Sequence, residues 1–326
     1  MDLPLIAPML ATAGTLPPPA QDAAWAYETK QDGQRAVFYL PGDGTLALRS
    51  RSGEDITPAY PELRPLADAL PPGLAAVLDG EIVMPDERGR SDFARLQPRM
   101  GLAASPERAR RLAARAPVHA VLFDVLHLRG RLLTGLPWSE RRQELEALAL
   151  AGPTWSTPAA LVGHGAQALR ATEEHGLEGL LCKRIASRYA PGARSRDWIK
   201  IRNMRTADVV VCGWLPGAGR LTGLPGSVLM GQFEASGGGL RYVGAVGTGW
   251  SERERAELAR LLHASEAAAH PFVQAPPVAA AARWVVPRLV GEVRYATRTG
   301  GGLLRQPSWL RLRPDLSPEE SSAYLD

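Results

Sequence analysis

The pattern of apolar and polar residues divides the chain into two regions of different texture. From about residue 25 to 202, short apolar runs typical of β-strands alternate with amphipathic segments typical of helices. We expect strands at residues 25–30, 36–40, 46–50, 77–83, 118–128 and 198–201. We expect helices from Ser105-Pro106 onward, over 139–150 and over 166–175, where Gly176 supplies a stop signal. The first region is therefore predicted to be α+β.

The second region, from about residue 207, has shorter strands and glycine-rich turns. The expected strands are 209–214, 228–234, 240–246, 282–286 and 291–295. One helix is expected at 252–268, because Ser251 and Glu254 have the spacing of a capping box. Several short strands with a single helix predict a small β-barrel of the OB type. The predicted domains are residues 1–203 and 204–326, with the boundary near 203–206.

Composition narrows the class of protein. With 45% hydrophobic and 22% charged residues, the 326-residue chain has the balance of a globular protein with a real core. It contains no apolar run long enough for a transmembrane helix and no basic segment of a signal peptide, so we expect a cytoplasmic protein without a membrane partner. Two cysteines and scattered histidines exclude a zinc ribbon or disulfide framework. The net charge of +4 is compatible with a polyanionic partner.

Lysine usage is the most informative part of the composition. Only Lys30, Lys183 and Lys200 are lysines among 38 basic residues. Arginine replaces lysine wherever a generic cation suffices, but it cannot lose its proton and so cannot act as an amine nucleophile. The three lysines therefore mark candidate sites, although each could also have survived by chance.

Lys30 lies in a short cluster that suits chemistry on a phosphate. Asp32 and Arg35 follow it, and Gly33 between them is expected to allow a tight turn that brings the three side chains together. An amine, a carboxylate and a forked donor can act as nucleophile, positioning group and oxyanion clamp. The alternative is a charged turn on the surface.

The cluster resembles the KxDGxR signature of the covalent nucleotidyltransferases, which include DNA ligases, RNA ligases and mRNA-capping enzymes. Further segments similar to motifs of that superfamily follow in order: Ser50-Arg51-Ser52-Gly53, then residues 78–83, 122–126, 178–183 and 197–202. The chain is thereby identified as a member of the ATP-dependent DNA ligases, of the two-domain type found in bacterial end-joining repair.

The resemblance implies roles for individual residues. It makes Lys30 the nucleophile that captures AMP, with Asp32 and Lys200 also catalytic and with Glu178 and Asp32 holding a divalent metal. The residues implied in binding the nucleotide or phosphates are Glu28, Arg35, Arg51, Glu81, Phe123, Lys183, Arg202 and Arg313. Glu28 would accept a hydrogen bond from the adenine amino group and so favour ATP over GTP. Phe123 would stack on the base, or else it is an ordinary core residue. Lys183 would lie on the opposite face of the expected strand from Glu178, because their positions differ by an odd number.

Three positions depart from the family pattern. Gln31 replaces an aromatic residue, Arg202 replaces a lysine, and Leu316 replaces the lysine of the RxDK motif that begins at Arg313. In the family that motif orients the departing pyrophosphate. Two alternatives follow from the missing lysine: charging of Lys30 is slower, or Arg311 or Arg313 compensates for it.

The implied fold is an adenylyltransferase domain followed by an OB-fold barrel. The implied function is sealing of DNA nicks or breaks in repair by non-homologous end joining, with ATP and Mg²⁺ or Mn²⁺, as a monomer, with a Ku-type end-binding protein as a possible partner. Two alternatives remain open. One is an RNA ligase or capping-type enzyme, and the other is a non-catalytic OB-fold nucleic-acid-binding protein. Leu316 favours the second, whereas Lys30, Glu178 and Lys200 argue against it.

Overall fold

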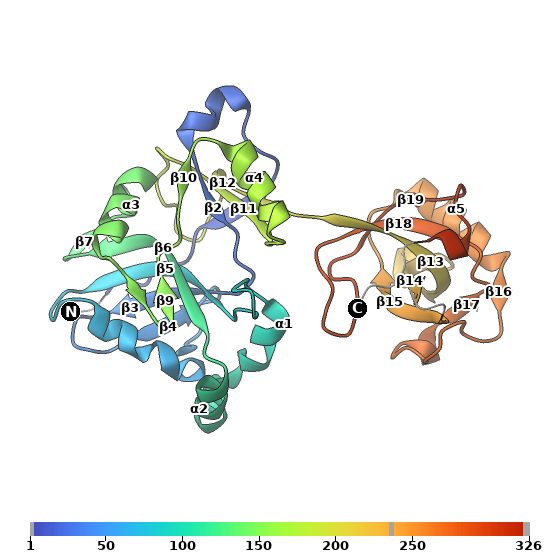
Figure 1. The fold of residues 1–326 in the computed structure, drawn as a ribbon, viewed down its shortest axis with the longest axis horizontal. Helices are drawn as coiled ribbons and strands as arrows, with labels where there is room; N and C mark the ends of the chain where they lie inside the picture. The colour runs from blue at the N-terminus through green and yellow to red at the C-terminus, as the bar shows by residue number, and fades with distance from the viewer. Residues whose placement is uncertain (1–2, 235–237, 322–326) are drawn as a thin grey trace. The chain divides into compact units, whose positions relative to one another are not determined.

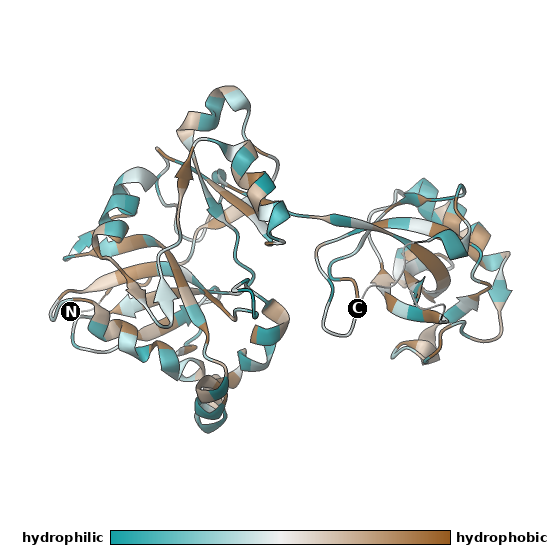
Figure 2. Cartoon of the chain, viewed as in Figure 1, coloured by the Kyte–Doolittle hydropathy of each residue, from teal (hydrophilic) through white to brown (hydrophobic). Residues whose placement is uncertain are grey.

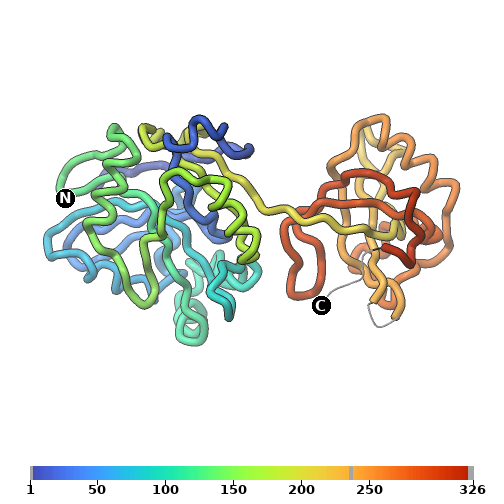
Figure 3. The backbone as a smooth tube through the Cα atoms, turned by 45° about the horizontal axis from the view of Figure 1, so that its top comes forward, coloured from blue at the N-terminus to red at the C-terminus, as the bar shows by residue number. Residues whose placement is uncertain are grey.

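The computed structural model describes residues 3–234 and 238–321. Two compact units, Met1–Asn203 and Met204–Asp326, make up the chain. In Figure 3 the chain passes once from the first unit to the second, near residue 203. Within the described ranges, none of the helices has the length and apolar character needed to cross a membrane.

The first unit is built on two β-sheets (Figure 1). The larger sheet has the order β4-β3-β5-β6-β9-β8, with β7 paired to β6, and the smaller has the order β1-β12-β11-β2-β10. The larger sheet comprises β3 (Gln34–Leu40), β4 (Ala47–Ser50), β5 (Ala76–Val83), β6 (His119–Leu128), β7 (Arg131–Leu132), β8 (Ala151–Gly152) and β9 (Trp155–Ser156). The smaller comprises β1 (Leu10–Ala13), β2 (Trp25–Thr29), β10 (Leu161–Val162), β11 (Gly179–Arg184) and β12 (Arg194–Arg202).

Four α-helices accompany these sheets: α1 (Phe93–Leu96), α2 (Pro106–Arg115), α3 (Trp138–Ala147) and α4 (Gly165–Glu174). In Figure 2 the central strands β5 and β6 of the larger sheet are mostly hydrophobic, whereas α2 is mostly hydrophilic. Leu169 on α4 packs on a buried cluster that contains Tyr27 and Leu180 of the smaller sheet. This helix therefore covers the outer face of that sheet.

The two sheets of the first unit face each other across a shared apolar layer. Val37, Val77 and Phe123 of the larger sheet form one buried cluster with Trp198 of the smaller sheet. Successive side chains on a strand point to opposite faces, so β12 presents Trp198 to this layer and Ile199 to the cluster under α4. The apolar layer between the sheets and the cluster under α4 thus fix the orientation of β12, including that of its polar residues.

The described residues of the second unit form one α-helix and an antiparallel sheet. Its order is β15-β14-β13-β17-β16, and β18 pairs with both β13 and β19. The elements are β13 (Arg205–Pro216), β14 (Pro225–Phe233), β15 (Leu240–Val246), α5 (Glu252–His263), β16 (Glu266–Ala267), β17 (Arg283–Val285), β18 (Val290–Tyr295) and β19 (Ser308–Leu312). Ser251 forms the expected capping box with Glu254.

The predicted α+β class is confirmed, but the second unit departs from the expected closed barrel. In the described part of the chain, no ladder joins β15 to β19. Instead, single backbone bonds connect the two edges, from Leu304 N to Val243 O (2.8 Å) and from Trp309 N to Thr248 O (2.8 Å). The expected helix 252–268 also ends early, because residues 266 and 267 pair with β17 as β16.

Candidate active site

Lys30 lies at the crossing between the two sheets. It follows β2 of the smaller sheet and precedes β3 of the larger one. Its backbone nitrogen donates to Gly179 O (2.9 Å), which extends the β2–β11 pairing by one residue. Its ammonium group donates to Glu178 Oε2 (2.5 Å) and to Gln31 O (3.1 Å). The lysine is thus tied by its main chain and its side chain to the strand that begins just after Glu178.

Gly33 serves a different purpose from the one expected. It is not among the glycines with a positive φ, so the turn does not depend on its conformational freedom. A Cβ added at this position would instead lie 2.2 Å from the carbonyl oxygen of Ile82 on β5. The absence of a side chain therefore lets the Lys30 turn pass directly against β5.

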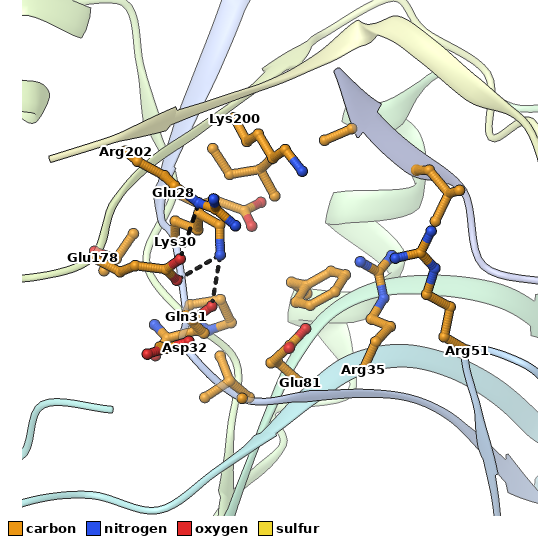
Figure 4. Close-up of a pocket in the computed structure, with 18 of the residues that line it drawn as sticks. Glu28, Lys30, Gln31, Asp32, Arg35, Arg51, Glu81, Glu178, Lys200 and Arg202 are labelled. Carbon is orange, nitrogen blue, oxygen red and sulfur yellow. Dashed lines mark hydrogen bonds and ion pairs between the residues drawn. The ribbon is translucent and has the colours of Figure 1, made fainter. Parts of the chain in front are cut away.

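A pocket of about 300 Å³ opens beside Lys30 (Figure 4). It collects ten of the twelve residues singled out in the sequence: Glu28, Lys30, Asp32, Arg35, Arg51, Glu81, Phe123, Glu178, Lys200 and Arg202. The elements that supply them come from both sheets. The pocket is therefore assembled where the sheets meet.

The carboxylates of Glu178 and Asp32 lie together at the Lys30 side of the pocket (Figure 4). Glu178 is only 12% exposed, and burial raises its pKa while Lys30 and Arg202 oppose the rise and Asp32 adds to it. The described residues contain no group of three or more ligands of the His, Cys, Asp or Glu type that could hold a metal. Two oxygen ligands fit Mg²⁺, which binds proteins through one or two carboxylates and completes its shell with water and phosphates.

Cations line the opposite walls of the pocket. Lys200 and Arg202 project from β12, and Arg35 and Arg51 lie across from them (Figure 4). Burial lowers the pKa of the Lys200 ammonium, and the nearby positive charges of Arg202 and Lys30 lower it further. Such a concentration of positive charge is suited to a polyanionic ligand.

Asp79 is a site residue whose function the sequence did not reveal. Its side chain is fully buried and accepts two bonds of 2.6 Å from Arg35 and one of 2.5 Å from the Tyr189 hydroxyl. Arg35 also lies over the Phe123 ring, 4.6 Å from its centroid. Asp79 therefore fixes the guanidinium in the pocket wall. Its partnership with Arg35 bridges 44 residues and leaves no local signal.

Arg194 is a second lining residue that was missed. The expected strand began only at residue 198, whereas β12 begins at Arg194. Extending the alternation backward from Lys200 would have placed Arg194 on the same face.

Two of the twelve residues lie outside the pocket. Lys183 is fully buried behind it, where its ammonium group pairs with Glu28 at 2.8 and 2.9 Å. Arg313 belongs to the second unit and pairs there with Asp208 (2.9 Å) and Asp315 (2.8 Å). Lys183 thus contacts the pocket through Glu28, and Arg313 belongs to a separate ion-pair cluster.

Comparison with known families gives two matches that cover most of the chain. Residues 8–202 match the family model described as the ATP dependent DNA ligase domain, and residues 222–316 match that of the ATP dependent DNA ligase C terminal region.

Individual relatives agree with these models. The chain is 42% identical over 317 residues to the multifunctional non-homologous end joining DNA repair protein LigD of Mycobacterium tuberculosis. The match covers 97% of this chain and 39% of that protein, so the chain spans about two fifths of the length of such relatives. It is also 35% identical to DNA ligase C1 of Mycolicibacterium smegmatis, with 100% of this chain and 95% of the relative covered.

The fold of this chain resembles those of several solved DNA ligase structures. The ligase domain of M. tuberculosis LigD matches with a TM-score of 0.56 and 41% identity, covering 97% of this chain and 98% of that one. A mycobacterial DNA ligase D complexed with ATP and MES matches with the same TM-score and identity, covering 98% of each chain. A Lig E DNA ligase matches with a TM-score of 0.61 at 23% identity, covering 95% of this chain and 100% of that one, which is a likeness of fold.

Proposed function

The chain belongs to the ATP-dependent DNA ligase family, and from that premise we propose that it joins 3′-hydroxyl and 5′-phosphate ends of DNA through AMP carried on Lys30. The observation that carries the proposal is the pocket itself. It places the one amine of the KxDGxR motif beside the carboxylates of Glu178 and Asp32, with Lys200 and Arg202 on one wall and Arg35 and Arg51 on the wall across from them. A relative solved with ATP supports the choice of nucleotide.

In the first step, the Lys30 amine attacks the α-phosphorus of ATP. A nitrogen–phosphorus bond forms, the bond to the bridging oxygen breaks, and pyrophosphate leaves. Lys30 must be neutral to attack, yet as an ammonium it pairs with Glu178 at 2.5 Å. The amine therefore becomes nucleophilic only after this ion pair opens and the ammonium group releases a proton to water. Lys200 and Arg202 neutralise charge on the phosphate oxygens, which is the main requirement of phosphoryl transfer.

The geometry suits a divalent ion beside Glu178 and Asp32. Both are carboxylates that line the pocket next to Lys30, and Mg²⁺ or Mn²⁺ accepts such oxygen ligands. When bound, the ion supplies positive charge against the phosphates.

Later steps use the other wall of the pocket. Arg35 and Arg51 bind the 5′-phosphate that receives AMP, and Asp32 orients the 3′-hydroxyl that finally displaces AMP and completes the phosphodiester. From the first step onward, Glu28 and Phe123 bind the adenine, and Glu81 binds the ribose.

We assign this activity to end-joining repair. The support is the 42% identity to a protein named for non-homologous end joining. A Ku-type end-binding protein is the partner that this assignment implies.

Two assays test the proposal. Wild-type protein incubated with α-labelled ATP should acquire covalent label, and K30A should acquire none. Label retained by K30A would refute the assignment of the nucleophile. In parallel, nicked DNA and nicked RNA duplexes should be compared with ATP and with GTP. Sealing of DNA with ATP is expected, whereas preferential sealing of RNA, or use of GTP, would favour an RNA ligase or capping-type enzyme.

A further inference from the structure

Lys183 is a fully buried lysine whose position suits nucleotide selection. Its ammonium group donates to both oxygens of Glu28 (2.8 and 2.9 Å) and to the backbone oxygen of Phe123 (3.3 Å). It also lies 4.4 Å from the centroid of the Phe123 ring and 4.6 Å from that of Trp198. Lys183 therefore contacts both Glu28 and Phe123, the two residues proposed to bind the adenine base, although it does not itself line the pocket.

Glu28 depends on this cation for its charge. The carboxylate is 2% exposed, and burial raises its pKa while Lys183 opposes the rise. Arg142 on α3 is the next cation, but its Nη1 is 3.7 Å from Glu28 and beyond hydrogen-bond distance. Asp124 on β6 acts in the opposite direction and raises the pKa of Glu28. Without Lys183, the pKa of this buried carboxyl group would rise further, which favours its protonated form.

The charge state decides which base the carboxyl group can recognise. An ionised carboxylate only accepts hydrogen bonds, whereas a protonated one also donates. Adenine offers an amino group as a donor at C6, and guanine offers an oxygen acceptor at the same position. At the C6 position, ionised Glu28 therefore accepts a hydrogen bond from the adenine amino group and is repelled by the guanine oxygen, while protonated Glu28 tolerates both.

We propose that Lys183 is a positioning residue that determines nucleotide specificity, because it keeps Glu28 ionised and fixed beside Phe123 so that the pocket selects ATP over GTP. The inference rests on the proposed function, in which Glu28 and Phe123 receive the base. Lys183 acts through Glu28 and does not touch the nucleotide.

The test measures the rate of covalent labelling with α-labelled ATP and GTP, as the ratio of their kcat/KM values, from pH 6 to pH 9. K183M should lower the preference for ATP by on the order of tenfold to a hundredfold, the value of one hydrogen bond to a charged group. Because Glu28 in K183M is protonated at low pH and ionises as pH rises, the preference should return toward pH 9.

The matched control is R99M. Arg99 forms another buried ion pair, with Glu62 (2.8 Å), and neither residue lines the pocket. R99M should be destabilised in the same way as K183M while keeping the wild-type ATP:GTP ratio at every pH. A loss of selectivity in R99M would show that any buried defect produces the effect and would overturn the proposal.

E28Q provides a second variant that does not require Lys183 to be removed. Its amide both donates and accepts, so it should lose selectivity equally at all pH values. If E28Q, or folded K183M, kept the wild-type ratio of kcat/KM for ATP to that for GTP, the inference would be overturned. The proposed function would still stand in that case, because the wild-type protein would have acquired covalent label. A wild-type protein that takes label from neither nucleotide would instead overturn the proposed function, and the inference with it.

Discussion

Replacing Asp79 by asparagine should weaken the first unit substantially, since the side chain is fully buried and accepts three hydrogen bonds. Breaking a buried ion pair costs about 3–5 kcal/mol. Two features reduce this value. Arg35 is 17% exposed toward the pocket, so water solvates the released guanidinium, and asparagine still accepts at one oxygen. We therefore expect D79N to lose about 2–3 kcal/mol of unfolding free energy.

The assay is urea unfolding followed by tryptophan fluorescence. Trp198 is one of the eight tryptophans that contribute to this signal, and it senses the site because the Tyr189 ring that bonds to Asp79 lies edge-on to it at 5.7 Å. For a unit of this size, the expected loss also corresponds to a fall in Tm of roughly 4–12 °C. Nick sealing by the AMP-charged protein should slow more than the charging step does, since Arg35 is proposed to hold the 5′-phosphate.

E87Q is the matched control, because it too neutralises one acidic partner of an arginine. Glu87 pairs with Arg95 at 2.7 Å, but the two side chains are 84% and 41% exposed. Solvent screens such a pair, so no measurable change in stability is expected. If D79N were no less stable than E87Q, the argument that Asp79 anchors Arg35 would fail.

Three further predictions follow from burial and close packing. Burial raises the pKa of Glu81 from its ordinary 4.5 to about 7, so the folded protein holds the extra proton and stability should fall as pH rises through this interval. E81Q should flatten that slope in urea midpoints measured from pH 4.5 to 8, and an unchanged slope would refute the assignment. G33A should cost about 3 kcal/mol, because its Cβ meets a backbone oxygen at 2.2 Å, whereas G135A, with nothing within 4 Å, should unfold at the wild-type urea midpoint. Burial raises the pKa of Cys182 to about 12 and that of Cys212 well above its ordinary value. Neither thiol should therefore react with Ellman's reagent until urea unfolds the chain. Rapid labelling of the native protein would contradict this prediction.

Local patterns in the sequence determined much of the secondary structure. The expected strand at 240–246 coincides with β15, and the capping box at Ser251 is present. Such features depend on residues a few positions apart, so they can be read without knowing the fold. Short edge strands could not be predicted in this way. The two-residue β10 carries no alternation of its own and exists because it pairs with β2.

The motif around Lys30 was visible in the sequence because its residues are adjacent. What the sequence by itself determined was therefore the set of chemical groups and their order along the chain. Only the tertiary structure decided how those groups pair. Lys183 meets Glu28 across 155 residues, and β2 and β3, consecutive in the chain, enter different sheets. These outcomes depend on which apolar faces pack together, and that choice is made by the whole core rather than by any one segment.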